Sequence, residues 1–241
     1  MNSSPPQRIL LKLSGETLMG SEPFGIQQDA CHTLALSLAE LQKQNLQIAL
    51  VIGGGNIFRG IKITGKGLPR VPADYMGMLA TMINGIALQE ALRSIGCDAI
   101  AMSALECPKA ITPYDLRKAQ NFLQEGKLLI FSGGTGNPFF TTDTAAALRA
   151  CEIGAHVLWK ATNVDGVYPA DPRTHPGLEK YSQISYSEVL AQKLQVMDAT
   201  AVILCRDNGI PIDVFNKALL RDRQFLSKMA QSTLGTRIAG D

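Results

Sequence analysis

Residues 8–16 read Arg-Ile-Leu-Leu-Lys-Leu-Ser-Gly-Glu, a short apolar run that ends in a serine and a glycine. Its apolar residues are consecutive and do not alternate with polar ones, which is typical of a strand covered on both faces in a parallel sheet. The Ser14-Gly15 pair predicts a tight turn directly after this strand. Lys12 places a charge among the leucines and indicates a functional role, with a lysine of an edge strand that extends its ammonium to water as the alternative.

The same pattern of an apolar run followed by a turn recurs along the chain. The other predicted strands cover 46–52, 99–102, 128–131, 156–160 and 212–215. Between them, apolar residues spaced three and four apart predict helices over 26–44, 75–93, 115–124, 142–153 and 219–229. Strands that alternate with helices favour an α/β layered fold around a mainly parallel sheet.

The composition excludes several classes of protein. The 241 residues are 46% hydrophobic and 18% charged, which is typical of a globular chain. The net charge of +2, without a dense basic run, argues against nucleic-acid binding, and no apolar run approaches the roughly 20 residues of a membrane helix. Five scattered cysteines without a C-x-x-C pair argue against disulfides and a metal site. The polar start without a signal-peptide core predicts a cytoplasmic protein.

Glycine-rich turns follow three of the predicted strands, at Ser14-Gly15, at 53–56 and at 133–137. Glycine allows the backbone to approach a ligand closely, and amides at a following helix start attract anions. Any one of these could be an ordinary strand-to-helix turn, but three together favour a ligand with several phosphates. Two glycine- and proline-rich segments, 60–72 and 165–177, predict irregular loops after strands, where open α/β sheets bind ligands.

Common nucleotide-binding and covalent-catalysis motifs fit poorly. Residues 60–67 nearly match the phosphate loop G-x-x-x-x-G-K-[ST], but Gly67 replaces the magnesium-binding hydroxyl and Pro69 opposes the helix that should follow. The dinucleotide fingerprint G-x-G-x-x-G is absent, and none of the three histidines has a plausible nucleophile or metal partner. What remains is a positive charge, Lys12, beside the glycine turns, which suits phosphoryl transfer.

Five stretches spread over nearly the whole chain carry a family resemblance: 8–16, 51–60, 74–81, 134–143 and 160–168. The run Gly-Thr-Gly-Asn-Pro-Phe-Phe-Thr-Thr-Asp at 134–143 is the most specific of them. Through these stretches the chain resembles the bacterial uridylate kinases of the amino acid kinase superfamily. The resemblance implies one domain over 1–241, built as a three-layer α/β/α sandwich with a mostly parallel central sheet. It also implies transfer of a phosphoryl group from ATP to UMP, giving ADP and UDP, with Mg²⁺ carried on ATP.

The resemblance also implies site residues, with the UMP site mainly in the N-terminal half plus 135–142 and the ATP site mainly in the C-terminal half. Implied catalytic residues are Lys12, Arg59, Asp143 and Asp198. Implied ATP contacts are Lys12, Leu13, Ser14, Gly15, Gly55, Arg59, Thr162, Tyr168 and Asp171. Implied UMP contacts are Gly54, Asp74, Thr135, Gly136, Asn137, Pro138, Phe139, Phe140, Thr141 and Thr142. The segment Gly20, Ser21, Glu22, Pro23, Phe24 and Gly25 aligns with a site for the activator GTP, and UTP is a possible inhibitor.

Several alternatives stay open at the level of sequence. The chain could instead form an acyl phosphate, as other kinases of this superfamily do, or bind nucleotides as a regulator without turnover. Asp74 could be a plain helix N-cap. His156 and Asn163 depart from the common family pattern, and Asn163 leaves Arg59 or Lys160 as the second basic group near the phosphates. The apolar helix expected after Asp74 covers more than one face, which favours a homo-oligomer, and the resemblance implies a hexamer.

Overall fold

The computed structural model describes residues 8–44, 46–58, 67–172, 174–175, 177–222, 224–230 and 234–240. The strands are β1 Arg8–Leu13, β2 Gln47–Ile52, β3 Ala99–Ser103, β4 Thr112–Pro113, β5 Leu128–Ser132, β6 Val157–Thr162, β7 Gln183–Ile184, β8 Ile212–Asn216 and β9 Thr236–Ile238. The helices are α1 Gln28–Gln42, α3 Arg70–Ser94, α4 Leu116–Gln124, α5 Thr142–Ile153, α6 Tyr186–Ala191, α7 Ala199–Asp207 and α8 Phe225–Ala230, with short 3₁₀ helices at η1 Gly15–Leu18 and η2 Lys217–Arg221.

The strands of the described residues form one sheet in the order β4-β3-β5-β2-β1-β6-β8-β9-β7. Neighbouring strands are parallel except β8 and β9, which are antiparallel. β1 lies inside the sheet between β2 and β6, so Lys12 is not an edge-strand lysine. Because the central strands are parallel, the turns after β1, β2, β5 and β6 all meet at one edge of the sheet.

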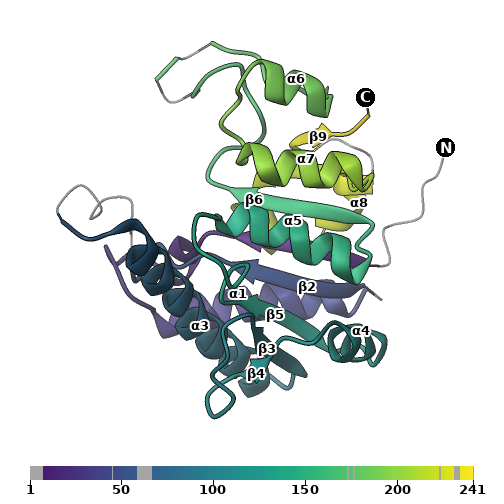
Figure 1. Cartoon of the computed structure of the whole chain (residues 1–241). Coiled ribbons are helices and arrows are strands. Elements are labelled where there is room, and N and C mark those ends of the chain that lie inside the picture. The colour runs from purple at the N-terminus through teal and green to yellow at the C-terminus, as the bar shows by residue number, and fades with distance from the viewer. Residues whose placement is uncertain are drawn as a thin grey trace.

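Helices cover both faces of the sheet, as Figure 1 shows, with α5 and α7 in front and α1 behind. Alternate residues of β1 face opposite cores, because successive side chains of a strand point to opposite faces. Ile9, Leu11 and Leu13 pack in the cluster that contains α1, α3 and α8, and Leu10 packs in the cluster that contains α4, α5, α6 and α7. The predicted three-layer α/β/α sandwich with a mostly parallel sheet is confirmed.

Every predicted strand is present, with bounds within two residues of those expected. The unpredicted strands β4, β7 and β9 are two or three residues long, which is too short to show a periodic pattern. The prediction of a single helix over 219–229 is wrong in part, because η2 and α8 share this range. Asp222 adopts an extended backbone between η2 and α8, and its carboxylate accepts a hydrogen bond from the Gln224 amide at 2.8 Å, which ends one helix and starts the next.

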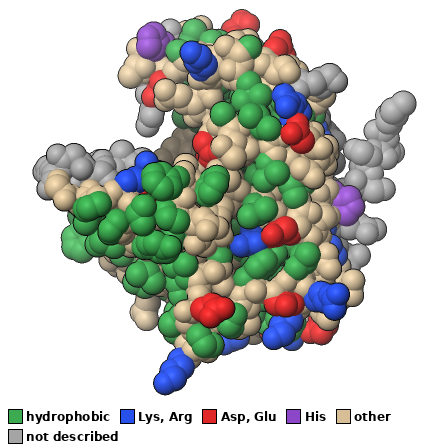
Figure 2. Space-filling view, in the orientation of Figure 1, with side chains coloured by type: hydrophobic (Ala, Val, Ile, Leu, Met, Phe, Trp, Pro, Cys, Tyr) green, Lys and Arg blue, Asp and Glu red, His purple; other side chains and the backbone are tan. Residues whose placement is uncertain are grey.

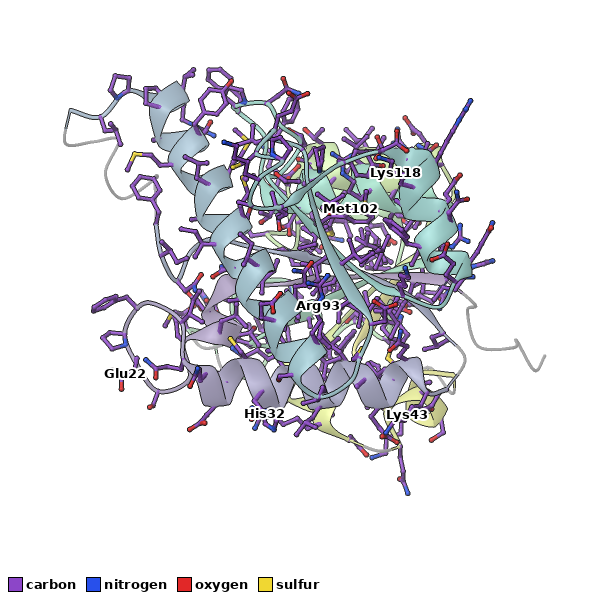
Figure 3. All side chains as sticks on the ribbon, turned by 90° about the horizontal axis from the view of Figure 1, so that it is seen from below. Glu22, His32, Lys43, Arg93, Met102 and Lys118 are labelled. Atoms are coloured by element: carbon purple, nitrogen blue, oxygen red, sulfur yellow. The ribbon has the colours of Figure 1, made fainter. Side chains whose placement is uncertain are left out.

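The long helix α3 begins at Arg70, five residues earlier than expected, and its N-cap is Pro69. Asp74 therefore lies inside the helix, and the interpretation of Asp74 as an N-cap is wrong. Figure 3 shows α3 lying beside α1, and Glu22 lies on the loop that precedes the N-terminal end of α1. Among the described residues, no helix has both the length and the apolar character needed to cross a membrane.

Candidate functional site

Two lysines lie side by side on the central strands. Lys12 of β1 and Lys160 of β6 are register partners on adjacent parallel strands. Lys12 follows Leu10 on the same face of its strand, and Lys160 follows Leu158, so both side chains point toward the layer that contains α5. Both lysine side chains are largely buried, with 13% and 11% of their surface exposed. Two buried cations are thus placed next to each other at the carboxyl ends of the strands.

The carboxylate of Asp143 bridges these two lysines. Its Oδ1 lies 2.6 Å from Lys12 Nζ, in the geometry of an ion pair and outside the angles of a directed hydrogen bond, and its Oδ2 accepts a hydrogen bond from Lys160 Nζ at 2.6 Å. Asp143 is the second residue of α5, whose N-cap Thr141 accepts a hydrogen bond from the Asp143 amide at 3.0 Å. The positive end of the helix dipole also favours a carboxylate at this position.

The charges of the three residues perturb one another. Burial raises the pKa of the Asp143 carboxyl, but the ammonium groups of Lys12 and Lys160 outweigh burial and hold that pKa below its usual value. The pKa of Lys160 is lowered, mainly because burial disfavours its charged form, while the charge of Asp143 opposes this shift. The charge of Asp198 also acts on Lys160, so two carboxylates roughly balance the two ammonium groups. The ammonium groups can still donate hydrogen bonds to the oxygens of a transferring phosphoryl group.

Asp198 lies beside this centre, where its negative charge favours the charged form of Lys160. It is the N-cap of α7 and accepts a hydrogen bond from the Ala201 amide at 2.9 Å. Its carboxylate also accepts hydrogen bonds from the hydroxyls of Thr141 and Thr144 on α5. Asp198 thus joins the N-terminal ends of α5 and α7.

A buried amide pair joins the turn after β2 to α3, and the turn at Gly15 packs closely against it. Asn56 Nδ2 donates to Asn84 Oδ1 at 2.9 Å, and Asn84 Nδ2 donates to Asn56 Oδ1 at 2.7 Å and to the Gly53 carbonyl at 2.7 Å. A Cβ at Gly15 would lie 2.3 Å from both Asn56 Oδ1 and the Gly53 carbonyl, so only glycine fits there. Glycine at position 54 is explained by packing, since a Cβ there would lie 2.8 Å from the Gly77 carbonyl of α3.

A cavity of about 600 Å³ opens next to Lys160. It is lined by the end of β6, the irregular segment that follows it and the stretch before α7, and it includes the predicted ATP contacts Thr162, Tyr168 and Asp171. The Tyr168 hydroxyl donates a hydrogen bond to Asp165 at 2.7 Å, which raises the pKa of Tyr168 and lowers that of Asp165. A cavity of this size suits a small organic ligand or nucleotide.

Seven of the nine predicted ATP contacts fall into two groups, whereas Gly55 lies in the turn after β2 and Arg59 falls outside the described residues. Thr162, Tyr168 and Asp171 line the cavity. Lys12 and Leu13 end β1, Ser14 caps η1 and accepts a hydrogen bond from the Glu16 amide at 3.3 Å, and Gly15 begins that short helix. Lys160 connects the two groups, because it lines the cavity and shares Asp143 with Lys12.

The predicted UMP contacts at 135–142 form the segment between β5 and α5. Asp74 of α3 reaches this segment and accepts a hydrogen bond from the Phe139 amide at 2.7 Å. Phe139 and Phe140 are exposed aromatic side chains, and Phe139 has a φ of +73°, which a residue other than glycine rarely adopts. The segment thus combines a carboxylate, two aromatic faces and the N-terminal end of α5.

The remaining residues singled out from the sequence are Arg59, the segment 20–25, His156 and Asn163. Arg59 falls outside the described residues, so its place at the site stays a prediction. In the segment 20–25, the Gly25 amide donates to the Asn56 carbonyl at 2.8 Å and Asn56 Nδ2 donates to the Gly25 carbonyl at 2.9 Å.

His156 precedes β6 at its amino end, whereas the cavity lies at the carboxyl end, so this departure from the family pattern is remote from the cavity. The Asn163 carbonyl accepts a hydrogen bond from Asn216 at 3.2 Å.

Comparison with known proteins bears directly on this geometry. The model of the Amino acid kinase family matches residues 7–216. The chain belongs to the amino acid kinase family. Within that family it is 56% identical over 236 residues to a uridylate kinase of Protochlamydia amoebophila (strain UWE25), covering 98% of this chain and 94% of the relative. The predicted resemblance to the uridylate kinases is thereby confirmed.

Solved structures of the amino acid kinase family agree with the fold. The UMP kinase from Bacillus anthracis superposes with a TM-score of 0.92 at 32% identity, covering 99% of this chain and 98% of that one. The UMP kinase from Ureaplasma parvum superposes with a TM-score of 0.88 at 34% identity, covering 98% of this chain and 100% of that one. The likeness extends over nearly the whole chain in both cases.

Sequence reasoning missed the buried amide pair Asn56–Asn84, and it named Lys160 only as one of two options for the second basic group. Asn84 interrupts an otherwise apolar helix face and is fully buried, so the signal was a polar residue at a core position. Lys160 could be noticed as a charged residue two positions after Leu158 in a predicted strand. That it lies next to Lys12 follows only from the strand order, which places β6 beside β1.

Proposed function

We propose that the chain transfers the γ-phosphoryl group of ATP to UMP, giving ADP and UDP, and that the Lys12–Asp143–Lys160 cluster is the reaction centre. The observation that carries this proposal is the position of the cluster. It lies between the 600 Å³ cavity beside Lys160 and the segment that starts α5. A donor nucleotide in the cavity and an acceptor nucleotide at the segment would present their phosphates to the same cationic centre. The uridylate kinase relative supports UMP as the acceptor.

Each group of residues has a role in direct in-line transfer. Lys12 and Lys160 balance the charge of the transferring group, and Asp143 holds both ammonium groups in place. Backbone amides of the turns after β1 and β2 bind phosphate oxygens, apart from the Gly53 amide, which donates to the Leu13 carbonyl at 3.0 Å. We assign the ATP site mainly to the C-terminal half, around the cavity, and the UMP site to the N-terminal half together with 135–142. Asp74 accepts hydrogen bonds from the ribose hydroxyls of UMP, and Asp198 positions α5.

Magnesium is expected to arrive on the phosphates of ATP. In the described part of the chain, no group of three or more acidic, histidine or cysteine side chains could hold a metal ion. Asp143, the acidic residue at the centre, is engaged by two lysines. Mg²⁺ commonly keeps several waters and binds substrate phosphates with few protein ligands, and when bound there it would neutralise phosphate charge.

The other two functions fit the site less well. A kinase that forms acyl phosphates takes a small acidic acceptor, whereas the acceptor segment here presents the two exposed aromatic rings of Phe139 and Phe140 beside Asp74, which suit a base and a ribose. A regulator without turnover has no need for a buried pair of lysines bridged by a carboxylate.

The segment 20–25 offers a route for regulation by GTP. It is bonded in both directions to Asn56, which also pairs with Asn84 beneath the turn at Gly53. A ligand that moves this segment would therefore act on a phosphate-binding turn. Activation by GTP and inhibition by UTP, together with a cytoplasmic location, remain predictions from the resemblance.

We also propose that α3 carries a contact between copies of the chain. Met76, Leu79 and Ile83 follow one another at helical spacing and are 43%, 51% and 51% exposed. Figure 2 shows a concentration of hydrophobic side chains over this helix. A second copy that presents the same stripe in a two-fold arrangement would cover both stripes, which suits the pairs expected within a hexamer.

The function is tested by ³¹P NMR of ATP, Mg²⁺ and the purified chain with UMP, CMP, GMP or AMP in turn. We expect ADP and UDP in equal amounts with UMP, and far slower transfer to the other nucleotides, because polar groups matched to uracil are left unpaired by another base. Equal turnover of CMP and UMP would defeat the acceptor assignment. Formation of ADP without any phosphorylated acceptor would defeat the kinase assignment.

A further inference from the structure

We infer that Arg70 is a positioning residue for the acceptor nucleotide and that it acts through Asp74. The inference rests on the proposed function, which assigns the ribose hydroxyls of UMP to the Asp74 carboxylate. Arg70 opens α3, one turn before Asp74, at the end of the helix that faces the 135–142 segment. None of the motifs found in the sequence includes it.

Arg70 holds the carboxylate of Asp74 from the helix side. Its Nε lies 2.8 Å from Oδ1 and 2.7 Å from Oδ2 of Asp74, so one N–H is shared between both oxygens. The Phe139 amide donates to Oδ2 at 2.7 Å. The guanidinium carbon of Arg70 also lies 5.6 Å from the centre of the Phe139 ring, within the range of a cation–π contact. Arg70, Asp74 and Phe139 therefore form a closed cluster that joins α3 to the acceptor segment.

The cluster fixes both the carboxylate and the acceptor segment. An ionised carboxylate has about four positions for hydrogen-bond donors. Arg70 occupies one on each oxygen and Phe139 a second on Oδ2, which leaves one position on Oδ1 for a ribose hydroxyl. The hydrogen bonds from Arg70 and Phe139 restrict the rotation of the carboxylate, so it is already oriented when the nucleotide binds. The bond to the amide also supports the left-handed backbone of Phe139.

An ordinary surface ion pair is the competing explanation, since Arg70 is 47% exposed and Asp74 follows it at i+4. Such a pair contributes little to stability and would have no effect on how the enzyme distinguishes UMP from dUMP. The Asp74 side chain, however, is only 18% exposed and also bonds to a residue 65 positions away in the chain. The response to the 2′-hydroxyl separates the two explanations.

The first experiment compares Arg70→Gln, Arg70→Lys and Arg93→Gln by steady-state kinetics with UMP, dUMP and ATP. Arg93 is a matched control, because it lies on the same helix, is 48% exposed and pairs with Glu90. We expect Arg70→Gln to raise the KM for UMP about 3- to 10-fold and to narrow the preference for UMP over dUMP, with kcat and the KM for ATP nearly unchanged. Arg70→Lys should recover part of the lost affinity for UMP. Arg93→Gln should leave the KM for UMP and the preference for UMP over dUMP unchanged.

A double-mutant cycle with Asp74→Asn then tests whether Arg70 acts through Asp74. We expect Arg70→Gln to add little once Asp74 is already replaced. If Asp74→Asn alters the UMP/dUMP preference but Arg70→Gln does not, or if the two effects simply add, the inference for Arg70 is overturned. If Asp74→Asn itself leaves both UMP KM and the dUMP preference unchanged, the ribose assignment in the proposed function fails instead. Thermal unfolding of each variant shows whether a lost affinity reflects a lost fold.

Discussion

Lys12 on β1 and Lys160 on β6 are register partners on adjacent strands, and each ammonium lies 2.6 Å from the same carboxylate, that of Asp143. Adjacent strands are separated by about 4.8 Å, so two lysines in register on one face repel each other unless an anion lies between them. Asp143 provides that anion from the first turn of α5. The arrangement keeps two ammonium groups together at the edge where the glycine turns meet, where they can donate to the oxygens of a phosphoryl group.

The first prediction concerns acid stability. The pKa of Asp143 is lower in the folded chain than its ordinary value, so the stability it contributes is complete above about pH 4 and is lost as the pH falls through the folded pKa. Asp143→Asn removes this dependence. Urea unfolding at neutral pH and near pH 3 should show a smaller loss of stability on acidification in Asp143→Asn than in the unmodified chain.

An exposed carboxylate provides the control for this measurement. Asp98 is 65% exposed and pairs only loosely with Lys127, at 3.8 Å. Asp98→Asn should follow the unmodified chain on acidification. If acidification lowers the free energy of unfolding of Asp143→Asn and Asp98→Asn by the same amount, Lys12 and Lys160 do not lower the pKa of Asp143 as described.

A second prediction concerns the contact between the glycine turns. Gly15→Ala would place a Cβ 2.3 Å from Asn56 Oδ1 and from the Gly53 carbonyl. We expect a loss of roughly 1–3 kcal/mol in the free energy of unfolding, because buried atoms must move apart, and a raised KM for ATP. Gly77→Ala is the control: apart from the backbone of its own helix, no atom of the described residues would lie within 4 Å of the new Cβ, and alanine favours the helix by about 0.5–1 kcal/mol. Unchanged stability in Gly15→Ala would disprove the close contact.

A third prediction concerns assembly through α3. Ile83→Lys places a charge in the middle of the exposed apolar stripe and should lower the molar mass measured by light scattering at micromolar concentration. Leu36→Lys on α1 is the control, since Leu36 is also 51% exposed but lies on another helix. A monomeric mass for the unmodified chain, or a mass that Ile83→Lys leaves unchanged, would rule out this contact.

Much of the fold could be predicted because the strands are buried on both faces. Runs such as 128–131 are continuous apolar stretches between turn residues, and such stretches are recognisable without alignment. The helices α6 and α7 were not predicted, although each begins with a cap that the sequence displays. Ser185 and Glu188 form a capping box, and Asp198 caps α7. These helices are short, and their apolar periodicity is correspondingly weak.

The site could be predicted only in part, because its parts meet through long-range topology. Lys12 stands out locally as a charge within an apolar strand. Lys160 is 148 positions later in the chain, and its pairing with Lys12 depends on β6 lying next to β1. Asp74 was expected before a helix, but α3 begins at Arg70, since Pro69 suits the position just before the first turn. The bond from Phe139 to Asp74 likewise depends on how β5 and α3 pack.

The most direct test of the account is the rate of UDP formation by Lys12→Ala with saturating ATP, UMP and Mg²⁺. Lys43→Ala is the control, because Lys43 is 74% exposed after the end of α1. Loss of one preorganised charge at the transferring group should lower kcat by about 10²- to 10³-fold, or about 3–4 kcal/mol. Because Lys12 also stabilises the buried Asp143 carboxylate, the variant should melt at a lower temperature, and its fold is checked at the assay temperature. We predict that result for Lys12→Ala and a normal kcat for Lys43→Ala. A folded Lys12→Ala variant with near-normal kcat would contradict the assignment of the lysine pair as the reaction centre.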